Sequence, residues 1–388
     1  MQRTAQDWIV LTQLTHHNAT AVGVVMGLQF GPQLLLLPLT GFAADHMDRR
    51  KLLIGTQVAM GLLALGLGLL TVTGMVQLWH VYVFAFLLGC AAAFDAPARQ
   101  TFVSELVGEA DLSNAVALNS TSFNAARMIG PAVAGMLIAG VGTGWVFLIN
   151  AASYAAVITS LTFLKVEQLH RNARAARARG SLLEGFRYVW KRPDLKAVLL
   201  MLAFIGTFGL NFPIFISTMS VRTFQAGPGE YGLLTSTMAI GSVIGALLAA
   251  RREQPRLALL FGASAVFATG LALAALMPTA WLFGLALIIV GVSAQTFTTT
   301  VISTVQMTTA PAMRGRVIAI ALAIAMGGTP IGAPIVGWVA DTCGPRWGLV
   351  VGAASGVASA LVYVRYLVRY RQLRIGLRTT SAMCIAGP

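Results

Sequence analysis

Three ionisable side chains, Arg3, Asp7 and Arg127, interrupt apolar stretches of the sequence and are the first candidates for chemistry. An ionisable group inside a membrane is costly, so each one found there is a functional candidate. The charge of a buried carboxylate depends strongly on its surroundings. Asp7 is therefore predicted to take up and release a proton, with Arg127 or Arg3 as its partner. The alternative is a static Asp7–Arg3 or Asp7–Arg127 ion pair that only fixes the packing.

A second set of polar and aromatic side chains could line a cavity for a bulky lipophilic ligand, because such sites are mostly apolar with a few placed polar groups. For the aromatic member, Phe212, the alternative is packing against lipid or in the core. The cavity candidates are Gln29, Gln33, Asn124, Asn150, Asn211, Phe212 and Gln295.

The composition decides where these residues must lie. Only 10% of the 388 residues are charged and 57% are hydrophobic, whereas a soluble domain averages about 25% charged residues. The apolar stretches are long enough to span a bilayer as helices, so an all-α integral membrane protein is expected. The net charge of +14 suggests nucleic acid as a partner. However, the charges lie in loops that alternate along the chain, so no nucleic-acid partner is expected.

The sequence lacks the residues that several other kinds of site would require. Three widely separated cysteines, Cys90, Cys343 and Cys384, suit neither a disulfide framework nor a metal site. No phosphate-binding loop is present, and the histidines lie in loops or at helix ends. We therefore expect no metal, no cofactor and no enzyme activity. A channel would need charge rings or a filter loop, and the sequence has neither.

Eleven spanning helices are expected to follow residues 1–15. Those first residues are too few to span a bilayer. They are interpreted as the outer half of a first helix whose inner half is absent, through a late start site or a truncated gene model. A genuinely shortened protein is the alternative. The eleven helices are expected at 19–44, 51–74, 77–101, 113–140, 144–165, 197–221, 231–250, 256–277, 280–308, 315–340 and 346–368.

Basic and neutral loops alternate between these helices, which predicts their orientation. The loops at 45–51, 166–196, 251–256 and 314–316 and the tail from Arg365 are rich in basic residues, and the loops between them are not. The positive-inside rule then places the central linker and the C-terminus in the cytoplasm.

The chain also repeats itself with a single offset of 202 residues, which predicts two halves of six helices related as parallel repeats. We expect an N-terminal half at 1–165, a linker at 166–196, a C-terminal half at 197–370 and a tail at 371–388. The matching pairs are Gly89 with Gly291, Gly135 with Gly337, and Trp145 with Trp347.

The loop at 41–51 reads GFAADHMDRRK and resembles the loop signature of the major facilitator superfamily between its second and third helices. The resemblance implies that Asp45 faces the start of the eleventh helix, where the helix dipole favours an anion. It also implies that Arg49 or Arg50 pairs with Asp95 and latches the two halves together at the cytoplasmic face. Solvated loop charges are the alternative. The residues of this motif are Gly41, Asp45, Arg49, Arg50 and Asp95.

The run RMIGPAVAG, which begins at Arg127, resembles the fifth-helix antiporter signature of exporters in the same superfamily. The signature rests on Gly130, Pro131 and Gly135. Glycine permits close helix approach and proline bends the helix, so this segment is expected to help close one mouth of a pathway. Ordinary packing of small residues is the alternative.

The linker carries a further amphipathic segment at 181–194, SLLEGFRYVWKRPD. Its apolar residues fall on one helical face, with Arg187 and Lys191 off that face. This pattern predicts an interfacial helix that lies on the anionic lipid of the inner leaflet.

Together these features resemble the drug:proton antiporter-like branch of the superfamily, with its macrolide efflux proteins and enterobactin exporters. The resemblance implies a multi-pass protein of the cell inner membrane that exports a small amphipathic compound by alternating access. The proton gradient would supply the energy, and the protein would act as a monomer. A proton-coupled uptake symporter of the same fold is the alternative.

Overall fold

The computed structural model describes residues 1–36, 39–40, 43, 47–108, 111–166, 182–250 and 257–371. Among these residues the regular secondary structure is entirely helical. Ten of the described helices are long and apolar enough to cross a membrane. The prediction of an all-α membrane protein is therefore confirmed.

The first group of helices covers residues 2–163 and the second covers residues 193–371, with one short helix before it. The first group contains α1 (Gln2–Ile9) with its π-helical continuation η1 (Val10–Leu14), α2 (Ala19–Leu35), α4 (Arg49–Val72), α5 (Leu78–Leu106), α6 (Leu112–Val141) and α7 (Thr143–Phe163). The short helix is α8 (Leu182–Lys191). The second group contains α9 (Pro193–Phe204), η4 (Ile205–Gly209), α10 (Phe212–Thr218), η5 (Met219–Thr223), α11 (Pro228–Ala250), α12 (Leu257–Leu276), α13 (Ala280–Thr308), α14 (Pro311–Thr342), α15 (Pro345–Tyr366) and η6 (Leu367–Arg371).

One expected helix differs clearly from the prediction. The segment expected to be continuous at 197–221 begins at Pro193 and is interrupted at Leu210 and Asn211, between η4 and α10. Pro213 has no N–H to donate to the preceding turn, so the regular hydrogen-bond ladder cannot continue through it. The buried Asn211 side chain donates to the Thr207 carbonyl oxygen at 2.7 Å and supports the interruption.

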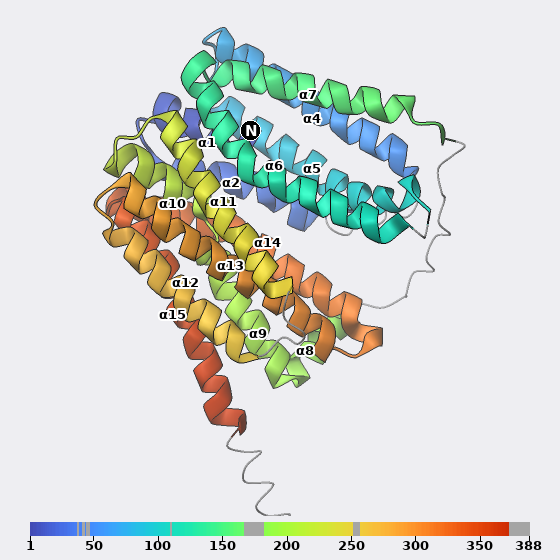
Figure 1. Cartoon of the computed structure of the whole chain (residues 1–388), viewed down its shortest axis with the longest axis vertical. Helices are drawn as coiled ribbons and strands as arrows, with labels where there is room; N and C mark the ends of the chain where they lie inside the picture. The colour runs from blue at the N-terminus through green and yellow to red at the C-terminus, as the bar shows by residue number, and fades with distance from the viewer. Residues whose placement is uncertain are drawn as a thin grey trace, which may run out of the picture.

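Successive helices run in opposite directions, so the helix ends gather at two ends of the molecule. We call the end at which α7 finishes and α8 begins the linker end. The opposite end, where η1 is followed by α2, is the far end. Across the two groups α2 packs against α14 and α6 packs against α11 (Figure 1).

The contacts between the groups are tightest near the far end, where glycines remove the side chain between two helices. A Cβ built on Gly135 would lie 2.4 Å from the Pro228 carbonyl oxygen, and one on Gly337 would lie 2.5 Å from the Ala19 carbonyl oxygen. These distances are too short for any side chain, so the backbones themselves are in contact. Residues 113–123 of α6, towards the linker end, are instead exposed or half-buried.

The other glycine pair of the repeat, Gly89 and Gly291, lies at contacts between helices of the same group. A Cβ on Gly89 of α5 would meet the carbonyl oxygen of Gln29 in α2 at 2.5 Å. One on Gly291 of α13 would meet the carbonyl oxygen of Met238 in α11 at 2.3 Å. Residues 202 apart in the sequence thus occupy matching places in the two groups.

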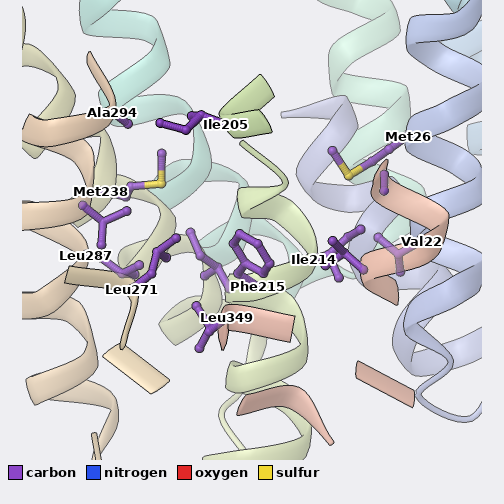
Figure 2. Packing of buried hydrophobic residues seen from close by; sticks show 14 of the residues in the cluster. Val22, Met26, Ile205, Ile214, Phe215, Met238, Leu271, Leu287, Ala294 and Leu349 are labelled. Atoms are coloured by element: carbon purple, nitrogen blue, oxygen red, sulfur yellow. The ribbon is translucent and has the colours of Figure 1, made fainter. Parts of the chain in front are cut away.

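The hydrophobic core continues from one group into the other through α10. Figure 2 shows Ile214 on the side of α10 that faces Val22 and Met26 of α2, and Phe215 on the side that faces the second group. Ile214, Val22 and Phe215 have 1% or less of their surface exposed. The interrupted helix therefore packs against both groups through α10.

Candidate functional site

A cavity of about 320 Å³ lies between the two groups of helices. It is lined by residues of α1, α2 and α6 from the first group, and by residues of η4–α10, α11 and α14 from the second. The lining residues are Arg3, Thr4, Asp7, Met26, Gln29, Phe30, Arg127, Pro131, Leu210, Phe212, Pro213, Ile216, Tyr231, Thr235, Met238, Ala239 and Thr329. We call it the central cavity.

The central cavity brings together the three ionisable residues singled out from the sequence, Arg3, Asp7 and Arg127. Arg3 and Asp7 share α1, and Arg127 comes from the middle of α6, far away in the sequence. Two of the amide and aromatic candidates, Gln29 and Phe212, lie in the same wall.

Asp7 is buried, with 5% of its surface exposed. Within the described part of the chain, no cation lies within ion-pair distance of its carboxylate, so the static Asp7–Arg3 and Asp7–Arg127 pairs are not present in this structure. Its partner is the Tyr231 hydroxyl of α11, which donates a hydrogen bond of 3.5 Å to Oδ2. The Arg3 guanidinium lies over the Phe30 ring, 4.9 Å from its centroid.

Buried amides extend the polar surroundings of α1. The Gln29 side chain donates to Gln6 Oε1 at 2.8 Å, and the Asn150 side chain of α7 donates to Gln2 Oε1 at 2.8 Å. The Nε2 groups of Gln2 and Gln6 have no hydrogen-bond partner in the described structure. A helix with this many buried polar groups is costly in an apolar setting, so the polar residues of α1 are candidates for a function.

The remaining cavity candidates do not line the central cavity in this structure, and four of them contact a residue four positions away in the sequence. Gln33 donates to the Gln29 carbonyl oxygen, Asn124 to the Ser120 carbonyl oxygen and Asn211 to the Thr207 carbonyl oxygen. Gln295 donates to the Thr299 hydroxyl within α13, and Asn150 contacts Gln2. The sequence gives the helix that holds a residue and not the side it faces, so a role of these five residues in ligand binding stays a prediction.

The loop motif also needs a correction. Gly41 and Asp45 lie outside the described residues. Arg49 contacts Glu105, with 2.6 Å between Nη1 and Oε1, and does not contact Asp95. Glu105 is ten residues further along α5 than Asp95, which amounts to about 15 Å of helix, and it therefore lies level with Arg49 at the linker end.

Arg50 and Asp95 both have other partners. Arg50 donates to the carbonyl oxygens of Leu161 and Thr162 at the end of α7. The buried Asp95 accepts hydrogen bonds from the side chains of Thr56 at 3.0 Å and Gln57 at 2.7 Å, and it also contacts Arg99. All these contacts stay within the first group of helices.

The residues of the Gly-Pro segment of α6 differ in how closely they pack against α11. A Cβ on Gly130 would meet nothing within 4 Å, so this glycine is not required by packing. Gly135 faces the start of α11, and the carbonyl oxygen of Pro131 lies 2.4 Å from a Cβ built on Gly232 of α11. The backbone N–H of Ala132 donates to the Ser236 hydroxyl at 3.1 Å. This segment therefore joins α6 to α11 across the two groups.

A second cavity, which the sequence did not indicate, opens at the far end. Its volume is about 840 Å³, and we call it the far vestibule. Its lining residues are Trp8, Thr12, Thr15, His16, His17, Asn18, Val221, Arg222, Gln225, Ala226 and Asp341. The non-glycine residues with positive φ in the described chain, His16, His17 and Gln225, all belong to this lining.

Two residues with long-range contacts, Tyr231 and Asp341, carry no distinctive signal in the sequence. Tyr231 lies near the start of a helix, where an aromatic residue is ordinarily taken as a membrane-interface anchor. Asp341 ends a long apolar helix, so it resembles an ordinary loop charge. No sequence signal pairs either residue with its partner, because the partners are more than 200 positions away.

The chemistry available at the central cavity is therefore recognition and proton binding. It holds two guanidinium groups, one carboxylate, one phenol and apolar walls. Within the residues that the structure describes, no group of three or more histidine, cysteine or acidic side chains could hold a metal ion.

Comparison with known proteins shows the family of the chain. The model of a family described as transmembrane secretion effector matches residues 1–375. The chain is 28% identical to the multidrug efflux pump Tap of Mycolicibacterium fortuitum over 358 residues, which cover 88% of this chain and 85% of that protein. It is 25% identical to the enterobactin exporter EntS of Shigella flexneri over 370 residues, which cover 94% and 87%.

Its fold is similar to that of a solved bacterial homologue of the human lysosomal transporter Spinster, in an inward-facing and occupied conformation. The TM-score is 0.73 at 14% sequence identity, over 96% of this chain and 94% of that one. At this identity the similarity concerns the fold alone.

Proposed function

The chain belongs to the transmembrane secretion effector family of major facilitator transporters, and from this premise we propose that it exports a small amphipathic compound in exchange for protons. It is a multi-pass membrane transporter and not an enzyme. Relatives with related sequences include a multidrug efflux pump and an enterobactin exporter, which supports export over uptake. The transported compound, the direction and the coupling ion are the parts that we propose.

The central cavity is the observation that carries this proposal. Both groups of helices line it, so a movement of one group against the other would change the side from which a ligand can reach it. Its walls combine aromatic rings and methionines with a few polar and charged groups. Such a surface suits an amphipathic ligand, because apolar parts are buried while polar groups fix its orientation.

Asp7 is the proposed proton carrier. It is the acidic residue of the central cavity lining, and no ion pair within the described chain holds it in the charged form. Arg3 shares its helix and Arg127 lines the same cavity, while Tyr231 is its hydrogen-bond partner. A carboxylate with one long hydrogen bond can lose that bond when the two groups separate, which links its protonation to the conformation.

The structure also supports a proposed contact between α8 and the membrane surface. Val189 of α8 is buried, whereas Phe186 and Trp190 are exposed next to Arg187 and Lys191. An apolar face flanked by cations suits the boundary between acyl chains and anionic headgroups. With α8 on the cytoplasmic leaflet of the inner membrane, the linker end faces the cytoplasm and the far end faces outwards. We further propose that the protein acts as a monomer, because both walls of the cavity come from one chain.

Transport of a fluorescent lipophilic dye tests the function. Cells expressing the chain should retain less dye than cells without it, and a proton uncoupler should abolish the difference. Asp7→Asn should lose export, whereas the matched control Asp111→Asn, an exposed residue that makes no side-chain cap hydrogen bond and does not line the cavity, should keep it. Normal, uncoupler-sensitive export by Asp7→Asn would show that Asp7 is not the carrier.

A pH-gradient experiment separates export from uptake. In vesicles, an antiporter moves substrate against the direction of proton flow and a symporter moves it with that flow. Accumulation of the dye in the direction of the imposed proton flow would replace our proposal by the uptake alternative.

A further inference from the structure

The central cavity and the far vestibule have no lining residue in common. They nevertheless approach each other within one step of the chain, since Asp7 lines the central cavity and the next residue, Trp8, lines the far vestibule. The wall between the two cavities is therefore thin at α1. The direct path from the central cavity to the far vestibule along α1 crosses this wall.

One aromatic pair stands in this wall. The Trp8 ring of α1 stacks on the Tyr231 ring of α11, with 5.7 Å between ring centroids and 25° between ring planes. Trp8 lines the far vestibule and Tyr231 lines the central cavity. Both are buried, with 8% and 2% of their surface exposed, so little of either ring is open to solvent.

The two rings come from different groups of helices, which makes the pair sensitive to the relative position of those groups. Helix α11 carries neighbouring contacts with the first group, from Pro228 to Gly135 and from Ser236 to Ala132 of α6. A movement that separates α11 from α1 must therefore unstack Trp8 from Tyr231.

We propose that the stacked rings of Trp8 and Tyr231 form the partition that closes the transport pathway towards the far end. Tyr231 is a positioning residue, because its hydrogen bond makes the position of its ring depend on what the Asp7 carboxylate binds. The inference rests on the proposed transport function. The Tyr231 hydroxyl donates to Asp7 Oδ2 while its ring holds the stack, so a single side chain takes part in both contacts.

This arrangement couples the opening of the partition to the loss of the hydrogen bond between Tyr231 and Asp7. When the partition opens, Tyr231 moves away with α11 and Asp7 loses its hydrogen-bond partner. When a ligand in the central cavity binds the Asp7 carboxylate, it replaces the Tyr231 hydroxyl as its partner. The ring of Tyr231 is then held by its stacking on Trp8 and no longer by the hydrogen bond to Asp7. Occupation of the central cavity therefore favours opening at the far end, which is the order of events that export requires.

Accessibility of a cysteine in the central cavity tests the partition without any substrate. In a background in which Cys90, Cys343 and Cys384 are replaced by serine, Thr235→Cys places a thiol on the central cavity lining. A membrane-impermeant maleimide is added to vesicles of one orientation at a time. A separate Thr279→Cys variant, at an exposed far-end position, identifies the membrane face from which the far end is reached.

From the far end, the parent thiol at position 235 should react slowly. Trp8→Ala should raise the rate about tenfold, as expected when a buried aromatic stack is lost. Tyr231→Phe keeps the ring and removes the hydroxyl, so its rate should rise about fivefold, the effect of one hydrogen bond. Trp281→Ala, an exposed tryptophan at the same end, and Tyr363→Phe, a tyrosine stacked on Phe261, should leave the rate unchanged.

Parent-like labelling of folded Trp8→Ala and Tyr231→Phe would overturn the proposal. If Trp8→Ala does not fold, Tyr231→Phe, which keeps the ring and nearly all of the packing volume, still decides the question. Because labelling requires no export, a chain that moves no dye can still show the partition. Conversely, active export with unchanged labelling would overturn the partition and leave the transport function in place.

Discussion

Asp341, in the last turn of α14, accepts two hydrogen bonds from Thr20, in the first turn of α2. Its Oδ2 atom receives the Thr20 backbone N–H at 2.8 Å and the Thr20 hydroxyl at 2.6 Å. Its Oδ1 atom receives the backbone N–H of Ala19 and one Arg222 guanidinium N–H. A residue of the second group thus caps a helix of the first group, where free N–H groups and the helix dipole favour an anion.

Removal of this charge should loosen the far end. Asp341→Asn keeps the size of the side chain but weakens charge-assisted hydrogen bonds, which are roughly twice as strong as neutral ones. Spin labels at Met75 and Thr279, on exposed far-end positions of the two groups, should show a longer or broader distance distribution in this variant. Asp48→Asn, which caps α4 inside the first group, should not change it. An unchanged distribution in Asp341→Asn would mean that the cap does not hold the groups together.

Alanine at Gly135 should be far more harmful than alanine at Gly130, although the two stand in one motif. A methyl group at Gly135 meets the Pro228 carbonyl oxygen at 2.4 Å, whereas one at Gly130 has open space. Overpacking of this kind costs about 1–3 kcal/mol, here at a contact between the groups. Thermal unfolding in detergent should show a lower midpoint for Gly135→Ala and a parent-like or higher one for Gly130→Ala, because alanine favours the helix. Equal midpoints would contradict the packing assignment.

Loss of Asp95 should cost more stability than loss of Glu105. Asp95→Ala leaves the buried Gln57 side chain without its acceptor, at about 1–3 kcal/mol for an unsatisfied group, whereas the Thr56 hydroxyl can still donate to the Leu53 carbonyl oxygen. Glu105→Ala removes one partly exposed ion pair with Arg49, which is typically worth at most about 1 kcal/mol. Denaturation of the two variants in the same detergent compares these values. The opposite order would show that the Arg49–Glu105 contact matters more than its exposure suggests.

Nitroxide labels on α8 should distinguish lipid contact from water contact. A label at Phe186 is expected to collide more with oxygen, which concentrates in the bilayer. A label at Arg187 is expected to collide more with a water-soluble nickel chelate. The reason is that the apolar face of α8 is exposed while Val189 faces the protein. Equal preference at both positions would argue against an interfacial helix.

Much of the fold follows from the sequence because membrane helices obey simple constraints. A run of apolar residues must satisfy its own backbone hydrogen bonds, so it spans as a helix, and a fixed offset between glycines reveals the repeat. The interruption at Asn211 escaped prediction. Proline and glycine occur in many membrane helices without ending them, so Pro213 alone was not decisive.

The sequence likewise predicts some parts of the candidate site and not others. The cost of placing charge in a membrane is enough to select Arg3, Asp7 and Arg127 from the sequence, and all three line the central cavity. The partner of Asp7, the partner of Arg49 and the direction in which each amide faces depend on how far each helix is rotated and shifted against its neighbours. Sequence spacing determines neither of these quantities.

By itself, the sequence determined that this chain is a helical membrane protein built from two related halves, with charged residues in its first apolar segment. The hydrogen bond from Tyr231 to Asp7 and those from the start of α2 to Asp341 became visible in the tertiary structure alone. Both contacts join residues more than 200 positions apart. They exist because the backbones of the two groups approach closely enough at the far end for short side chains to meet.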